Sequence, residues 1–245
     1  MEKRLRLLMT NDDGIGSDLM LPFVTEMRKD FDVVAIVPRE DSSLTAHSVS
    51  MRPDQRLQLV GEDYYVLDGF PADCVALGLS APEFGVFDAV VAGVNRGLNV
   101  GFDVWYSGTV AAAREAALMG NCGIAISCAE FAQDMAESAA ICADLIDGVI
   151  RRRIAERGTV ININVPSLKA GGLRGLAVTR LAQHGTRSTF RLDKTDVKEW
   201  RVGVALEPSP GVSCQDDCEC SALRRGYASV AVAQRFHCAS AYERA

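Results

Sequence analysis

Short apolar runs alternate with amphipathic or Ala-rich stretches along the first two-thirds of the chain. The apolar runs predict strands at residues 4–10, 31–37, 87–92, 124–127 and 160–165. The stretches between them predict helices at residues 18–29, 71–80, 108–120 and 131–154. Because strands that alternate with helices form right-handed crossover units, the pattern favours a mainly parallel sheet covered on both faces.

The pattern changes near residue 173, after which little helix is expected. Alternating runs predict strands at residues 173–180, 188–193, 200–206 and 227–233. An earlier pair of runs, at 56–60 and 64–67, flanks Gly61-Glu62-Asp63 and predicts a hairpin. We therefore expect an α/β core over residues 1–172 and a β-rich segment over 173–245 that covers the site or contacts another subunit.

Composition and charge narrow the classes of partner. A chain of 245 residues with 48% hydrophobic residues can bury a sizeable core. Its formal net charge of −6 gives no general attraction to nucleic-acid polymers or to anionic membranes, and a small phosphate ester fits better. The first residues carry no long apolar h-region with a small-residue cleavage site, so we expect a cytoplasmic protein.

The eight cysteines are expected to be reduced thiols. Cys74, Cys122, Cys128 and Cys142 lie in apolar segments, where a free cysteine packs as a small core residue. Zinc is one interpretation of a second set near the C-terminus, namely Cys214, Cys218, Cys220, His237 and Cys238. Its spacing is not that of a standard zinc motif, so an oxidisable loop is the favoured interpretation.

Polar residues follow three of the predicted strands. They are Asn11-Asp12-Asp13 after the first strand, a Ser-rich loop at residues 38–50, and a Gly-rich loop containing Asn95 and Asn99. In a parallel sheet, ligands bind beyond the carboxyl ends of the strands. Adjacent carboxylates repel each other unless a cation lies beside them, and a hard divalent metal ion suits oxygen ligands. In isolation, however, Asp-Asp-Gly is more often a simple turn.

Ser107-Gly108-Thr109 precedes the predicted Ala-rich helix. A hydroxyl residue at this position is often only an N-cap, but a helix N-terminus with free N–H groups also binds phosphate. The dinucleotide fingerprint GxGxxG is absent after the first strand, and so is the Walker sequence GxxxxGK[ST]. Nucleotide binding of those two kinds is therefore disfavoured.

Taken together, the motifs resemble the SurE family of metal-dependent 5′/3′-nucleotidases. They are LLMTNDDGIG, the loop after VVAIVPRED, LDGFPADCVALGL, AGVNRGLNVGFDVWYSGTVAAAREAALMG and INVP. The resemblance implies metal ligands at Asp12, Asp13, Ser43 and Asn95, and phosphate-binding residues at Asn99, Ser107, Gly108 and Thr109. Leu44 stands where the family usually has a Gly after the metal-binding Ser, so Ser42 is an alternative to Ser43. The family's usual His-Ala-Pro-Gly is replaced by Gly16-Ser17-Asp18-Leu19.

The resemblance also implies a fold, a cofactor and an activity. The fold would be a Rossmann-like three-layer sandwich with a C-terminal β segment exchanged between subunits, giving a homodimer or tetramer. One Mn²⁺ or Mg²⁺ ion per subunit would serve hydrolysis of nucleoside monophosphates, and of short polyphosphate in some members. Asp12 and Asp13 would be the catalytic residues, with one of them activating a water; the sequence does not say which.

Several alternatives stay open at this point. A non-catalytic nucleotide sensor could use the same pocket, although it would not need the full set of metal ligands. A glycosyltransferase-like protein usually carries Asp-x-Asp, whereas Asp12 and Asp13 are adjacent. Loop residues His47 and His184 are weak candidates for a general acid, and none is assigned.

Overall fold

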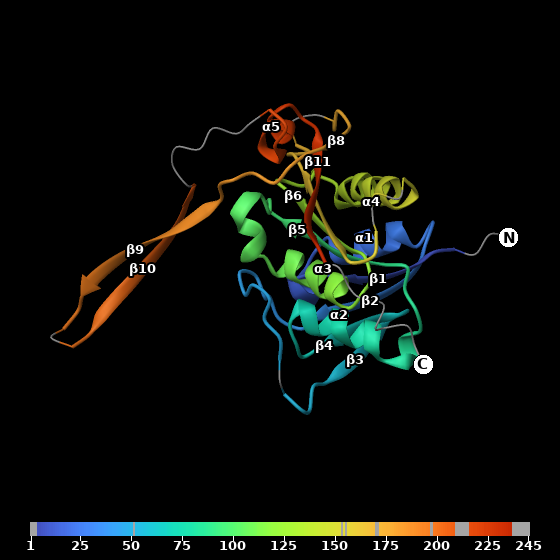
Figure 1. Ribbon diagram of the computed structural model, residues 1–245. Helices are drawn as coiled ribbons and strands as arrows, with labels where there is room; N and C mark the ends of the chain where they lie inside the picture. Colours follow the sequence, from blue (N-terminus) through green and yellow to red (C-terminus); the bar gives the residue numbers. More distant parts are fainter. Residues whose placement is uncertain are drawn as a thin grey trace.

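The computed structural model describes residues 4–50, 52–152, 154, 156–169, 172–196, 198–208 and 216–236. Its strands are β1 (Arg6–Thr10), β2 (Asp32–Pro38), β3 (Leu57–Gly61), β4 (Tyr64–Leu67), β5 (Ala89–Arg96), β6 (Gly123–Cys128), β7 (Thr159–Val165), β8 (Leu176–Val178), β9 (Thr186–Lys194), β10 (Trp200–Pro208) and β11 (Ala228–Arg235). Nine of them form one sheet in the order β3-β4-β2-β1-β5-β6-β7-β11-β8 (Figure 1). The strands from β2 through β1, β5 and β6 to β7 are parallel, which confirms the expected mainly parallel sheet.

Helices cover both faces of this sheet. They are α1 (Met20–Met27), α2 (Pro71–Ser80), α3 (Gly108–Leu118), α4 (Met135–Arg151) and α5 (Glu219–Arg224). Helices α1 and α4 share one hydrophobic cluster with Leu7 and Met9 of β1, whereas α2 and α3 share another with Leu8. Successive strand residues point to opposite faces, so this alternation along β1 feeds both layers. The three-layer α/β fold is confirmed.

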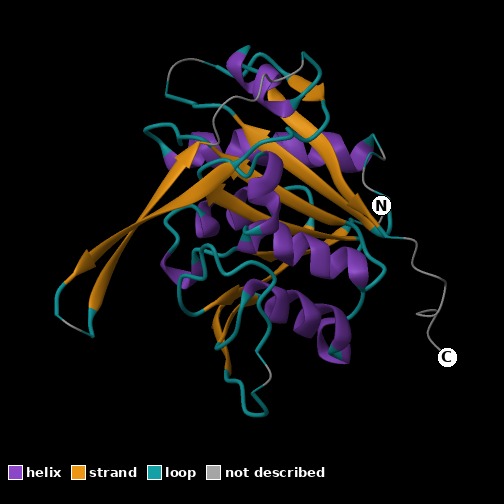
Figure 2. Ribbon diagram, turned by 60° about the vertical axis from the view of Figure 1, so that its left-hand side comes forward, coloured by secondary structure: helices purple, strands orange, loops and turns teal. Residues whose placement is uncertain are grey.

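The β-rich character of the C-terminal segment is also confirmed, but its strands divide between two sheets. Strand β11 pairs antiparallel with β7 and parallel with β8, so both β8 and β11 belong to the main sheet. Strands β9 and β10 pair only with each other and form a hairpin, here called the arm (residues 186–208), which projects from the body (Figures 1 and 2). The short helix α5 lies between the arm and β11 and was not predicted.

One face of the arm is apolar and uncovered. In the β9–β10 register Phe190 faces Val204 and Leu192 faces Val202, and paired or alternate residues share a face. The large apolar side chains of this face are Phe190, Leu192, Trp200, Val202, Val204 and Leu206, each at least 54% exposed. An isolated two-stranded hairpin gains little stability from its own contacts.

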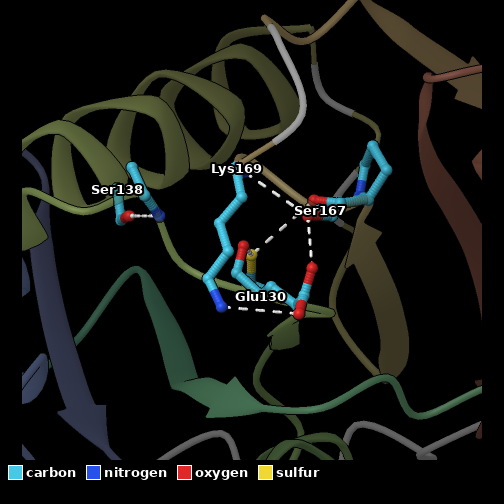
Figure 3. Close-up of polar contacts among 7 residues, drawn as sticks. Glu130, Ser138, Ser167 and Lys169 are labelled. Atoms are coloured by element: carbon cyan, nitrogen blue, oxygen red, sulfur yellow. Dashed lines mark hydrogen bonds and ion pairs between the residues drawn. The ribbon is translucent and has the colours of Figure 1, made fainter.

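The loops that follow β6 and β7 are tied together beyond the sheet (Figure 3). The Ser167 hydroxyl donates a hydrogen bond of 2.7 Å to Glu130 Oε2, and Lys169 Nζ lies 3.5 Å from Glu130 Oε1. The Ser167 bond is the largest influence that holds the pKa of Glu130 below its ordinary value, and the charge and hydrogen bond of Lys169 act in the same direction. In the same region the Ser138 hydroxyl accepts a 2.8 Å hydrogen bond from the Ala132 N–H.

Cysteine chemistry follows the expectation in the core but not near the C-terminus. Cys74, Cys122, Cys128 and Cys142 are free and buried, as predicted, and Cys220 is also free. Cys218 is disulfide-bonded, so the expectation of reduced thiols is wrong for this residue. The loop predicted around it is also wrong in part, because Cys218 caps α5 and Cys220 lies within that helix. Cys214, His237 and Cys238 lie outside the described residues.

Candidate active site

The candidate site lies at the carboxyl ends of β1 and β5, where the strand order reverses. From β1 the chain builds the sheet through β2 and β4 in one direction, and from β5 through β6 and β7 in the other. Loops on either side of such a switch point diverge and leave a crevice, which is the usual ligand site of open α/β sheets. Asp12 and Asp13 follow β1 directly, and Asn95 lies near the end of β5.

Asp12 is buried and held by the first turn of α3. Thr109 donates its hydroxyl to Asp12 Oδ1 at 2.5 Å. A Cβ atom placed on Gly108 would lie 2.9 Å from the Asp12 Cβ, so only glycine lets this carboxylate pack so closely against the helix N-terminus. Burial raises the pKa of Asp12, while the Thr109 hydroxyl and N–H oppose that rise. The Thr109 hydroxyl therefore orients a carboxylate in this structure.

Asp13 is only half-buried and lies in the field of two other carboxylates. Burial, then the charges of Asp12 and Asp41, raise its pKa to about 6, against a smaller opposing influence from Arg96. A pair of neighbouring carboxylates raised in this way is a site where a cation would be stabilised. The contribution of Asp41 was not predicted, although its loop was named as part of the site.

The two candidate serines differ in their surroundings. Ser42 is buried, and its N–H donates to the Asp12 carbonyl at 2.7 Å, so its backbone fixes the loop to the end of β1. Ser43 is exposed, and its hydroxyl donates to Asp41 Oδ1 at 2.6 Å. That bond is the main cause of the lowered pKa of Asp41. Leu44 has a φ of 59°, the left-handed conformation that glycine adopts most readily.

Asn95 and Asn99 join a row of polar side chains across the sheet. Asn95 is in register with Ser127 of β6, and Ser127 with Asn164 of β7. The Asn95 amide donates to the Gly97 carbonyl at 2.8 Å, which orients its side chain. Asn99 donates from Nδ2 to the Ser127 hydroxyl at 2.8 Å and from its N–H to Asn164 Oδ1 at 2.8 Å. The side chain of Asn99 thus anchors its own loop.

Residues that the sequence did not single out complete this network. The Asn99 carbonyl accepts hydrogen bonds from the amides of Asn162 and Asn164, which are fully buried in β7. Glu219 is also fully buried, and its Oε1 accepts from the N–H groups of Gly101 and Ala182. Burial raises the pKa of Glu219. Two Asn residues inside the apolar run of β7 are the only sequence signal that could have indicated this network.

Ser107 is the N-cap residue of α3, and this role is compatible with the predicted binding of phosphate. Its Oγ accepts from the Val110 N–H at 3.1 Å. Accepting this bond leaves the hydroxyl proton of Ser107 available to donate. Ser107 and Asn99 are nevertheless buried, and so is Gly108, whereas Asp13 is partly exposed.

The donor set fits a hard divalent cation. Asp12 and Asp13 would offer carboxylate oxygens to such an ion, and Asn95 would offer an amide oxygen. The neighbouring Asn11 Oδ1 is buried with no hydrogen-bond partner among the described residues. Within those same parts of the chain, no three His, Cys, Asp or Glu side chains are grouped for a metal ion. A site here therefore depends on amide and hydroxyl oxygens, and it suits Mg²⁺ or Mn²⁺ better than zinc.

The two loop histidines have structural contacts. His47 Nε2 lies 2.8 Å from Glu115 Oε2, which links the loop after β2 to α3. The His184 carbonyl accepts a hydrogen bond from the Phe102 N–H, which links the segment before the arm to the η3 turn (Gly101–Trp105). No general acid is assigned from these contacts.

Comparison with known proteins decides the family. A family profile described as Survival protein SurE matches residues 7–188 of the chain. The chain belongs to the SurE family. Every predicted metal-binding and phosphate-binding residue lies inside the span that matches this family.

Similar SurE proteins cover nearly the whole chain. A protein of Kosmotoga olearia named 5′-nucleotidase SurE is 34% identical over 92% of this chain and 90% of its own length. One of Citrifermentans bemidjiense with the same name is 32% identical, over 92% and 91%. The solved structure of the SurE protein of Aquifex aeolicus has a TM-score of 0.76 and 28% identity, and it covers 92% of both chains. The fold match therefore includes the C-terminal segment.

Proposed function

We propose that this SurE protein is a metal-dependent phosphomonoesterase that hydrolyses nucleoside monophosphates, a 5′/3′-nucleotidase. The observation that carries the proposal is the Asp12 carboxylate, held against the first turn of α3 with Asp13 beside it. This arrangement brings negative ligands for a cation and a helix N-terminus for an anion to one point. The names of the relatives, 5′-nucleotidase SurE, support the same substrate class.

The metal ligands of the proposal are Asp12, Asp13, Ser43 and Asn95, which would hold one divalent cation per subunit, Mn²⁺ or Mg²⁺. When bound, such a cation supplies Lewis acidity toward a phosphoryl oxygen and toward water. Asp12 is fixed by Thr109 and orients the site. Asp13 is less buried, so its carboxylate is the better placed of the two to take a proton from the attacking water.

The phosphate-binding residues of the proposal act from the α3 side. The N–H groups of the first turn, at Gly108 and Thr109, and the Ser107 hydroxyl would stabilise charge that develops on the phosphoryl oxygens. Asn99 would act by holding the loop before η3 in place through Ser127 and Asn164. The reaction needs no covalent intermediate, since water attacks phosphorus and the nucleoside hydroxyl leaves.

The first experiment is phosphate release from nucleoside 5′- and 3′-monophosphates and from short polyphosphate, with Mn²⁺, with Mg²⁺ and with chelator. We expect metal-dependent release from the monophosphates. Replacement of Asp13 by Asn should lower the rate of phosphate release by at least about 10³-fold, as expected for loss of a metal-binding base. Asp18→Asn is the matched control, because Asp18 is exposed and pairs with Arg96.

A non-catalytic sensor is the alternative that this experiment addresses. A folded protein that binds a nucleotide but releases no phosphate with any metal would replace the enzyme proposal by the sensor. Release from polyphosphate alone would keep the phosphatase and change its substrate class. The 3′ activity is decided by the ratio of rates on 3′- and 5′-monophosphates of one nucleoside.

We also propose a homodimer or tetramer held through the arm. The uncovered apolar face of the arm, from Phe190 to Leu206, supports this assembly.

No helix in the described part of the chain has the length and hydropathy needed to span a bilayer.

A further inference from the structure

A cavity adjoins the candidate active site on the β2 side of the sheet. It has a volume of about 740 Å³, and its walls come from the loop after β2, the segment around Ser50 and the turn before α2. Ser42 and Asp41 line the cavity and also belong to the site, because the Ser42 N–H donates to the Asp12 carbonyl and the Asp41 charge acts on Asp13. The Ser42 carbonyl also lies against Gly108, where a Cβ would be 3.2 Å from it. Ser42 therefore lies between the cavity and the place proposed for the phosphate.

Phe70 lines this cavity from an unusual position. It is the N-cap residue of α2, with φ −90° and ψ 168°. A phenyl ring cannot accept the hydrogen bond that Ser, Thr, Asp or Asn would accept there, so Phe is a poor cap. The cap is completed only by Asp73, whose Oδ2 accepts from the Phe70 N–H at 2.8 Å. The Phe70 ring is half-buried, lowers the stability of the helix and lines a cavity. It is therefore suited to contact a ligand with an aromatic or apolar surface.

The walls beside Phe70 are fixed before any ligand arrives. The Asp73 carboxylate also accepts the Ser50 N–H, at 3.0 Å and 2.9 Å to its two oxygens. The same side chain thus holds the Phe70 turn and the neighbouring segment that carries Val49 and Ser50. Preformed walls lower the entropy cost of binding.

The charge of the cavity selects against one class of substrate. Its lining contains the carboxylates Glu40, Asp41 and Asp68 and the guanidinium groups Arg39 and Arg52. Arg39 is paired with Asp68, so no strong positive field remains to bind a second or third phosphate. A neutral nucleoside fits this lining better than an extended polyphosphate chain.

We propose that this cavity is the nucleoside subsite and that the Phe70 ring stacks on the base of the substrate. The proposal rests on the proposed function for the position of the phosphate. Stacking on a flat ring is tolerant of base identity, because every base has a π face. The subsite would therefore favour nucleotides over base-free phosphate esters without a strict choice among bases.

Phe70→Ser is the decisive variant, because it removes the ring and supplies a better N-cap. The fold should therefore be retained, with a melting temperature at or above that of the wild type. We expect KM for AMP and UMP to rise about tenfold, the size typical of one lost base–aromatic stack, with little change in kcat. KM for ribose 5-phosphate, which lacks a base, should stay unchanged. Phe70→Trp should keep the wild-type KM for the nucleotides.

The control is Phe102→Ser, which removes an exposed ring of η3 that does not line the cavity. It should leave KM for AMP unchanged. A rise in Phe102→Ser but not in Phe70→Ser would overturn the proposal and place the base on η3. Equal KM changes for AMP and ribose 5-phosphate in Phe70→Ser, or no change in either, would also overturn it.

Direct binding separates this proposal from the proposed function. Calorimetry with adenosine tests the subsite without turnover. If the wild type released phosphate from no ester, the proposed function would fail. Adenosine binding that is present in the wild type and lost in Phe70→Ser would still support the nucleoside subsite. Binding that is unchanged in Phe70→Ser, or that cannot be detected in the wild type, would overturn it.

Discussion

The loops around Asp12 and the β9–β10 arm are built in opposite ways. Around Asp12, polar side chains are buried and matched to donors of the same chain, as Asn99 is to Ser127 and Asn164. In the arm, two strands pair only with each other, and the apolar side chains of one face are exposed. The first region is organised by contacts within its own subunit, whereas the apolar face of the second is exposed among the residues that the structure describes. We therefore propose that chemistry and assembly depend on separate parts of the chain.

The largest expected effect comes from removing the arm. Replacing residues 187–207 by a short Gly-Ser linker should convert the proposed dimer or tetramer entirely to monomer, because the uncovered apolar face is lost. The core should keep its helical circular dichroism, since β8 and β11 belong to the main sheet. Light scattering measures the mass. An unchanged oligomer would show that other surfaces hold the assembly. The role in assembly that we propose for the arm would then be wrong.

The next effect is on stability and concerns Glu219. Glu219→Ala should lower the free energy of unfolding by about 3 kcal/mol, because the buried N–H groups of Gly101 and Ala182 lose their acceptor. Glu219→Gln is the matched control, since its amide oxygen can still accept both bonds. Urea unfolding measures the difference. Equal losses in both variants would mean that charge, and not hydrogen bonding, is what the site requires.

A smaller effect is the pH dependence of the metal-free protein. The pKa of Asp13 is raised from 3.8 to about 6 in the folded state. Between these pH values the folded protein holds a proton that the unfolded chain has released. Stability in chelator should therefore fall as pH rises from about 4 through 6, by at most about 2 kcal/mol for this partly exposed group.

Thermal unfolding at several pH values measures this trend. Asp13→Asn should flatten it, and saturating Mn²⁺ should reverse it, because the ion requires ionised carboxylates. A stability that rises with pH in chelator would contradict the assignment of Asp13 as a carboxyl raised by burial and by its neighbours.

The smallest effect is expected at Leu44, in the loop that carries Ser43. Leu44→Gly should stabilise the protein by up to about 1 kcal/mol, because the native φ of 59° is strained for leucine. The greater freedom of glycine in the unfolded chain offsets part of this gain. Leu44→Ala is the control, since it removes the exposed side chain and keeps the strain. A melting temperature that rises equally in both variants would assign the effect to the side chain.

Most elements of the fold could be predicted because their signals are local. The apolar strands and the four long helices follow from periodicity and from end signals such as Pro71 and Gly120. Strand β5 runs four residues past its predicted end at Ala92, to Arg96, since a register shift lets Asn95 pair with Ser127. That extension depends on a neighbouring strand, which no local pattern contains.

The candidate site divides in the same way. Asp12, Asp13 and Asn95 were named because they follow strands, and the resemblance to SurE added the residues near α3. Glu219 was missed since a Glu is expected at the surface unless a partner is known. Its partners, the N–H groups of Gly101 and Ala182, lie 118 and 37 residues away in sequence. Short α5, which carries Glu219, gives only a six-residue signal.

The position of β11 has a consequence for the order in which the protein is made. Residues 228–235 fill the place between β7 and β8, although they follow the arm in the chain. Until they have been made, β7 presents an open edge, and unpaired edges invite pairing with other chains. A nascent chain stalled after the arm would therefore lack both the strand that closes its sheet and the Glu219 anchor of its site loop. The sheet can close only after residue 235 has been made, so chaperone protection should matter most for chains arrested before that point.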